Sequence, residues 1–138
     1  MMMRVAFVVL GLFVTLMTTV SIQASAPGKD VDLLAVAADI ARVGDVAMTR
    51  YEPDRGMDTA DVFSDIYFDD FEGSGMEAVI GLNDPGAKSE LESLFSSVIG
   101  LASKARPQAE VSQAWETLRT RIESVAVHTA GKESEGSW

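Results

Sequence analysis

The chain has 138 residues, a formal net charge of −10 at pH 7 and no cysteine. The length suits one ordinary domain, and the lack of cysteine excludes a disulfide framework and a lipid attachment at cysteine. The acidic balance disfavours binding to nucleic acid and to anionic membrane surfaces, because like charges repel. We therefore expect no nucleic-acid partner.

The N-terminus has the three parts of a secretory signal peptide. Arg4 carries the only charged side chain of residues 1–26, an apolar run follows over residues 5–20, and small residues stand at Ala24 and Ala26. The pattern predicts a signal peptide over residues 1–26 and export to the periplasm.

Pro27 follows the predicted cleavage site and is unfavourable for processing there. Two alternatives therefore stay open. The chain is cut after Ala24, or it keeps residues 5–22 as an uncleaved anchor that tethers the domain to the cytoplasmic membrane. These 18 apolar residues are at the lower limit for spanning a bilayer.

Hydrophobic periodicity and capping residues place four helical segments. They are expected over residues 31–51, 58–73 with an extension to 81, 85–104 and 109–127. Asp30 is the expected N-cap of the first helix, and Asp84 followed by Pro85 is a preferred helix start. The second helix can kink or pause at the three residues Gly73, Ser74 and Gly75.

No stretch has the alternating pattern of a β-strand, so the expected fold class is all-α. Four helices of similar length joined by short loops predict an up-down antiparallel four-helix bundle over residues 27–128. The fourth helix supplies a nearly regular apolar seam to its core: Val111, Ala114, Trp115, Leu118, Ile122 and Val125. Residues 129–138 are polar and are expected to form a flexible tail.

Five acids form one stripe along the second helix when the segment is wound at about 100° per residue. They are Asp58, Asp61, Asp65, Asp69 and Glu72. Stacked carboxylates repel one another, and a shared hard metal ion would relieve the repulsion. The alternative is a solvated face whose first acids complement the helix dipole.

Asp70 and Glu77 project away from that stripe, toward the apolar side of the second helix. They are seven residues apart and share a face if the helix is continuous. Carboxylates in an apolar layer need a partner, a raised pKa or a metal, and Asp45 at the edge of the first helix could join them. The alternative is a salt bridge, for which the candidate cations are Arg42, Arg119 and Arg121.

No catalytic set can be assembled from these residues. The single histidine, His128, lies at the end of the last helix, and position 125 is Val125, so the Glu-x-x-His motif of di-iron bundles is absent. No nucleophile, histidine and acid set and no phosphate loop is present either. We therefore do not expect an enzyme.

One segment resembles a known family. Residues 67–77 read Tyr-Phe-Asp-Asp-Phe-Glu-Gly-Ser-Gly-Met-Glu, Asp84 and Pro85 follow, and residues 88–95 read Lys-Ser-Glu-Leu-Glu-Ser-Leu-Phe. This pattern resembles the periplasmic N-terminal domain of the bacterial high-affinity iron permease (iron/lead permease) family. The resemblance implies a helical extracytoplasmic domain that captures or presents iron.

The chain departs from that family in one respect. The family's membrane core has several long apolar helices with an Arg-Glu-Gly-x-Glu motif, and no such helix follows residue 30 here. The resemblance implies a module that binds iron and serves a permease core or other iron-uptake components. Its expected iron ligands are Asp69, Glu72 and Glu77, joined by Asp65 and Asp70. The alternative is a structural or interaction domain of a permease complex without a metal of its own.

Overall fold

The computed structural model describes residues 31–136, so the expected signal peptide, its cleavage and the last two residues lie outside the described part. Residues 31–136 contain helices and no strand, which confirms the all-α fold class. The elements are α1 (Leu33–Thr49), the 3₁₀-helix η1 (Pro53–Arg55), α2 (Gly56–Asp65), the π-helix η2 (Ile66–Glu72), α3 (Met76–Asn83), α4 (Pro85–Ser103) and α5 (Gln108–Glu135). None of these helices combines the length and the apolarity that are needed to span a bilayer.

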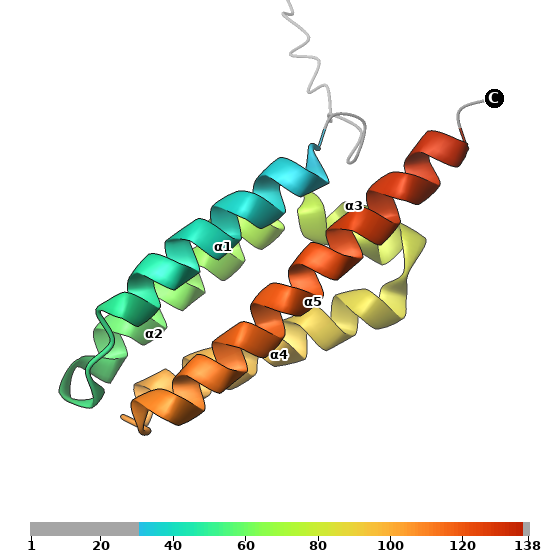
Figure 1. Cartoon of the computed structure of the whole chain (residues 1–138). Helices are drawn as coiled ribbons and strands as arrows, with labels where there is room; N and C mark the ends of the chain where they lie inside the picture. The colour runs from blue at the N-terminus through green and yellow to red at the C-terminus, as the bar shows by residue number, and fades with distance from the viewer. Residues whose placement is uncertain (1–30, 137–138) are drawn as a thin grey trace, which may run out of the picture.

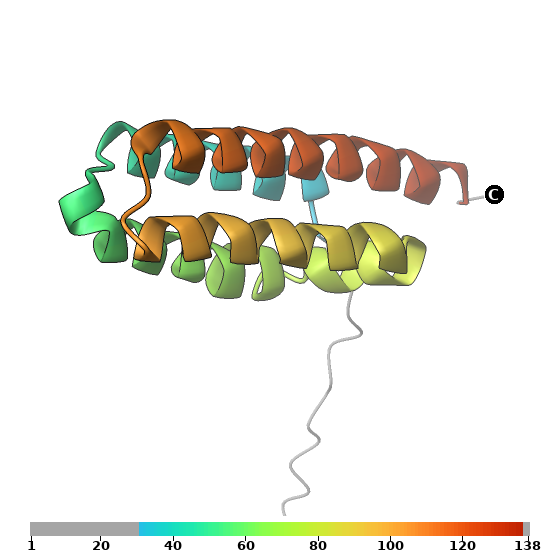
Figure 2. The same cartoon turned by 90° about the horizontal axis from the view of Figure 1, so that it is seen from below.

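The long helices lie side by side, as Figures 1 and 2 show from two directions. Helix α5 packs on α1 and on α4, and α2 packs on α4. Helix α3 follows α2 and η2 along the chain and also packs on α4. The described chain begins and α5 ends at the same end of the molecule (Figure 1).

The capping residues explain where two helices begin. The side chain of Asp84 accepts a hydrogen bond from the backbone N–H of Ala87 at 2.9 Å, which confirms the predicted start of α4. Helix α1 begins at Leu33, and its N-cap is Asp32 rather than the expected Asp30. Asp32 caps the helix because its carboxylate accepts a hydrogen bond from the N–H of Ala35, at 3.0 Å. This N–H has no partner within the helix.

Helix α5 is longer than expected. It continues to Glu135, eight residues beyond Val127, so most of the segment expected to be a flexible tail is helical. Thr129 is only 1 % exposed, which extends the packed face of α5 by another turn. Gly131 costs about 1 kcal/mol relative to alanine, and that is too little to end a helix whose neighbours favour it.

The second expected helix is interrupted where the sequence allowed a pause. The π-helix η2 closes with a hydrogen bond from the N–H of Gly73 to the carbonyl of Phe68, five residues back, at 2.9 Å. Gly75 has φ +88°, a left-handed conformation that glycine adopts without a steric cost. The chain therefore turns at residues 73–75 and starts α3 in a new direction.

Aromatic rings form the centre of the core. The rings of Phe63 and Trp115 are 5.2 Å apart, and Tyr67 and Phe71 both stack on Phe95, at 5.3 and 5.2 Å. These ring contacts join α2 and η2 to α4 and α5. Phe68 is the exception, because η2 turns it outward and leaves it 61 % exposed.

Helices α1 and α5 approach closely at Gly44. A Cβ atom added at Gly44 would overlap the indole ring of Trp115. The indole N–H donates a hydrogen bond to the carboxylate of Asp45 at 2.8 Å, so the ring is fixed in this position. Only a residue without a side chain allows this contact.

We expect Gly44→Ala to lower the free energy of unfolding by about 1–3 kcal/mol, because overlap with Trp115 outweighs the gain of about 1 kcal/mol in helix propensity. The matched control is Gly100→Ala in α4, where an added Cβ meets no atom within 4 Å. That variant should be stabilised. Urea unfolding followed by circular dichroism measures both changes, and equal stabilisation of the two variants would contradict the packing argument.

Candidate functional site

The acids of the predicted stripe do not converge. All five side chains, from Asp58 to Glu72, are exposed, and Asp58 pairs with Arg55 at 2.8 Å. The α-helical spacing ends at Asp65, and the wider turns of η2 carry Asp69 and Glu72 out of line. Within residues 31–136, no three acidic or histidine side chains are grouped so that they could hold a metal ion.

Asp70 is half-buried and lies beside α1. Burial raises the pKa of the Asp70 carboxyl, and the nearby carboxylates of Asp69 and Asp39 raise it further. Arg42 acts in the opposite direction, but its own ion pair in the structure is with Asp39, at 3.4 Å. Asp70 is therefore a poorly compensated carboxylate next to α1.

Glu77 lies on a different side, against α4. Its side chain is only 15 % exposed, and its Oε1 is 2.9 Å from the Nζ of Lys88. Asp70 and Glu77 would share a face only on a continuous helix, and the turn at residues 73–75 separates them. The need of Glu77 for a partner is met by a lysine rather than by an arginine or a second predicted acid.

Lys88 joins two carboxylates from different helices. Its Nζ is 2.9 Å from Oε1 of Glu77 in α3 and 2.9 Å from Oε1 of Glu92 in α4. The aliphatic stem of Lys88 lies against Gly81, where an added Cβ would come within 2.9 Å of Cδ. We call Glu77, Lys88 and Glu92 the lysine clip.

The members of the lysine clip shift one another's pKa values. Hydrogen bonds to Glu92 and Glu77 raise the pKa of the Lys88 ammonium, and the hydrogen bond that Lys88 donates to Glu92 is the main cause that lowers the pKa of the Glu92 carboxyl. The charges of the clip also act on the phenol of Tyr67. Burial is the main cause that raises the pKa of Tyr67, and the carboxylates of Glu77, Glu92 and Glu72 raise it further.

The clip contains one predicted ligand, Glu77, and sequence reasoning missed its other two members. The i, i+4 spacing of Lys88 and Glu92 is a signal for a pair on one helix. The contact of Lys88 with Glu77 depends on how α3 returns onto α4, and no local pattern encodes it. Chemically, the ammonium takes the position between the carboxylates that a metal ion would need.

The candidate arginines pair with other acids. Arg119 contacts Asp45 at 3.1 Å, so it joins α5 to α1, and it also contacts Glu116 at 3.1 Å. Arg121 contacts Glu90 at 2.7 Å and joins α5 to α4. These bridges tie helices together and do not reach Asp70 or Glu77.

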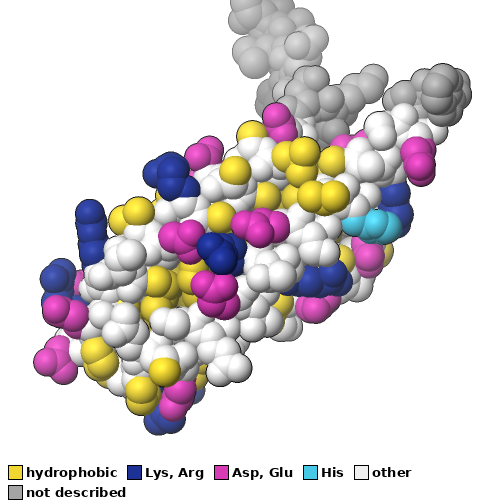
Figure 3. Space-filling model, in the orientation of Figure 1, with side chains coloured by type: hydrophobic (Ala, Val, Ile, Leu, Met, Phe, Trp, Pro, Cys, Tyr) yellow, Lys and Arg dark blue, Asp and Glu magenta, His cyan; other side chains and the backbone are white. Residues whose placement is uncertain are grey.

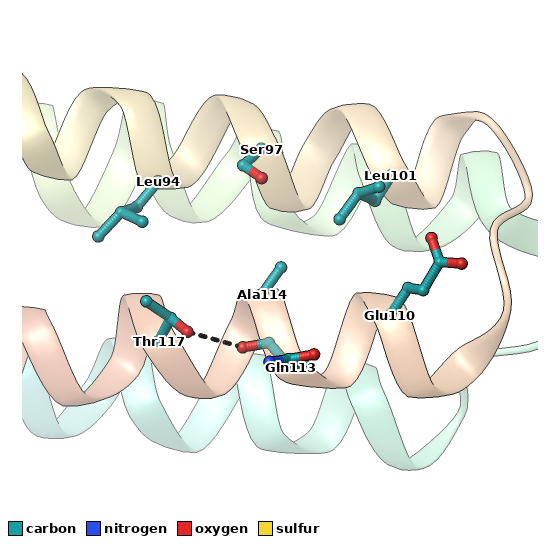
Figure 4. A pocket seen from close by; sticks show the side chains of 7 residues that line it. All are labelled: Leu94, Ser97, Leu101, Glu110, Gln113, Ala114 and Thr117. Atoms are coloured by element: carbon teal, nitrogen blue, oxygen red, sulfur yellow. Dashed lines mark hydrogen bonds between the residues drawn. The ribbon is translucent and has the colours of Figure 1, made fainter.

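A groove runs between α4 and α5 (Figure 4). Two adjoining hollows of about 380 and 500 Å³ share Leu94 and Thr117. Leu94, Leu101 and Ala114 supply apolar surface, and the hydroxyl of Thr117 donates to the carbonyl of Gln113 at 2.9 Å. We call this the α4–α5 groove.

Charged pairs stand at the two ends of the α4–α5 groove. They are Arg106 with Glu110, at 2.9 Å, and Arg121 with Glu90, at 2.7 Å. Between these ends the groove is lined mostly by uncharged side chains, and by Glu116, which pairs with Arg119 at 3.1 Å. By contrast, the face seen in Figure 3 mixes acidic, basic and apolar side chains.

Comparison of the chain with protein-family models, curated proteins and solved structures found no match.

We expect Lys88→Met to lower Tm by roughly 2–5 °C at pH 7, because Glu77 loses its partner while it stays mostly buried. The difference from wild type should shrink as the pH falls. The Glu92 carboxyl has a lowered pKa in the folded state, so its contribution is present above the ordinary carboxyl pKa and is lost as the pH falls through the folded value.

Lys104→Met is the matched control for Lys88→Met, because Lys104 is exposed at the end of α4 and makes no ion pair within the described residues. Its Tm should stay within about 1 °C of wild type. Scanning fluorimetry between pH 3 and pH 7 measures both variants. A Tm loss for Lys88→Met that does not change with pH would count against the clip.

We expect Asp70→Asn to raise Tm at pH 7 by about 1–3 °C. The folded state raises the pKa of this carboxyl, so its ionisation destabilises the fold above the raised value. This cost disappears as the pH falls below the ordinary pKa of aspartate, and the gain should vanish there. Asp61→Asn, at an exposed position of α2, should show no such gain in the same pH series.

Proposed function

We propose that this chain is an exported helical module of an iron-uptake permease system and that it serves this system by docking on its membrane core. Residues 1–26 would act as the signal peptide that delivers the module to the periplasm. In this proposal the fold is an up-down four-helix bundle, in which α2, η2 and α3 together form the second helix.

The link to iron uptake rests on the resemblance of residues 67–77 and 84–95 to the family's periplasmic domain. The structure gives the resembling residues architectural roles. Tyr67 and Phe71 stack on Phe95, and Gly75 makes the left-handed turn before α3. These roles support a shared way of folding more than a shared set of metal ligands.

The α4–α5 groove is the observation that carries the docking role. Leu94, Leu101 and Ala114 line it together with small hydroxyl side chains, and its charged lining residues are Glu110, Glu116, Glu90 and Arg121. An apolar patch bordered by polar and charged side chains is the usual composition of a protein interface. The groove is also shallow, which suits the side of a partner helix better than an enclosed ligand.

A second candidate function is iron presentation, and one observation favours it. Glu77 and Glu92 hold carboxylate oxygens at 2.9 Å from the Nζ of Lys88, and their charges also act on the phenol of Tyr67. Hard oxygen atoms of this kind are the ligands that ferric iron prefers. Iron would have to displace the ammonium of Lys88. The iron ligands expected from the sequence are less well supported as a set, because Asp70 lies beside α1 and the side chains of Asp65, Asp69 and Glu72 are exposed.

Iron uptake by cells that lack this chain tests the proposal. We expect deletion to lower the rate of iron uptake and wild type to restore it. A variant with Asp65, Asp69 and Asp70 changed to Asn and Glu72 changed to Gln should restore it equally. Ser97→Arg, which puts a charge into the α4–α5 groove, should restore it poorly, because a buried unpaired charge disrupts an interface.

Asp61→Arg is the control for Ser97→Arg, since it adds the same side chain at an exposed position outside the groove. Deletion without an effect on iron uptake would overturn the permease link. Failure of the four-acid variant would favour the iron ligands expected from the sequence. Saturable iron binding by the purified wild type that Lys88→Met strengthens would favour iron presentation by the lysine clip over docking.

A further inference from the structure

A second groove lies between α1 and α2. It has a volume of about 360 Å³ and is more enclosed than the α4–α5 groove. Gly56, at the start of α2, packs directly on the backbone carbonyl of Ala102, where any Cβ would overlap. This contact draws α2 toward α4, and α2 packs more extensively there than on α1.

The walls of this α1–α2 groove are mainly apolar. Val43, Val46 and Ala47 come from α1, and Val62 comes from α2. Val46 is 42 % exposed, although a valine at a helix–helix boundary is usually covered. The groove is large enough for a small ligand, since ligand sites begin at about 300 Å³.

The charges at the groove are positive in a strongly acidic protein. Arg50 and Arg55 line it together with the single acid Asp58. Arg55 donates to Asp58 from Nε at 2.9 Å and from Nη2 at 2.8 Å. Arg50 makes no side-chain hydrogen bond or ion pair with any residue of the described range. One guanidinium is therefore available to an anion.

Thr59 adds a polar group inside the groove. Its side chain lines the groove, although the residue is only 6 % exposed. Several other hydroxyls in the helices bond to carbonyls of their own helix, as Ser64 does with Ala60 at 2.9 Å. The hydroxyl of Thr59 makes no hydrogen bond within residues 31–136. It is not fully enclosed by protein, so it can donate to a polar group of a ligand.

We infer that the α1–α2 groove binds a small apolar carboxylate of the fatty-acid type, with its chain against the valines, its carboxylate on Arg50 and the Thr59 hydroxyl as a hydrogen-bond donor. A monoanion matches the single free guanidinium better than a dianion. This site is separate from the α4–α5 groove and from the lysine clip, so the inference does not depend on the proposed function.

Calorimetric titration of the purified protein with decanoate, below its micellar concentration, tests the inference. We expect saturable binding with one ligand per chain. Arg50→Gln should weaken binding about tenfold, because it removes a charge-assisted hydrogen bond. Thr59→Val, which keeps the shape of the side chain, should weaken it about threefold. Decanol should bind about tenfold more weakly than decanoate.

Arg42→Gln is the matched control, because Arg42 is also on α1 but pairs with Asp39 and lies outside the groove. Its affinity for decanoate should equal that of wild type. The ¹³C resonance of carboxyl-labelled decanoate should shift with wild type and not with Arg50→Gln. Equal binding by wild type and Arg50→Gln, or no saturable binding up to about 1 mM, would overturn the inference.

Discussion

The turn that interrupts the second helix is the constraint on which the arrangement of charges depends. Gly73 closes the π-helix η2, and Gly75 adopts φ +88° before α3 begins. A continuous helix would have aligned Asp70 with Glu77. The interruption directs one carboxylate toward α1 and the other toward α4, where Lys88 neutralises it. The acids thus stay separate, although they are close in sequence.

The two grooves follow from unequal packing around α2. Because Gly56 brings α2 against α4, the boundary between α1 and α2 is left partly open and lined by valines. The α4–α5 groove has another origin. Helices α4 and α5 pack on each other along their length, but small side chains such as Ser97 and Ala114 leave a hollow at the surface between them. The α1–α2 groove is the more enclosed of the two and carries a free guanidinium, whereas the α4–α5 groove is shallow and its charged lining residues are mostly acids. They therefore suit different kinds of occupant.

The sequence predicted those features that depend on local patterns. Asp84 and Pro85 marked the start of α4, and the seam from Val111 to Val125 marked the buried face of α5. It could not predict η2, because winding the segment at a fixed angle assumes α-helical turns throughout. The clip was missed because the contact of Lys88 with Glu77 is made only when α3 folds back onto α4. Asp30 was expected as the cap of α1, but the helix begins at Leu33, so the capping residue is Asp32.

The unequal lengths of the helices have a mechanical consequence. Helix α5 has 28 residues and α1 has 17, so α5 is about 42 Å long and α1 about 26 Å. The contact of Trp115 with Gly44 lies near the start of α5, far from its exposed last turns. An unbroken helix is stiff along this distance. A sideways force on the exposed last turns would therefore be transmitted first to the packed turn at Thr129 and then along the helix to the indole contact.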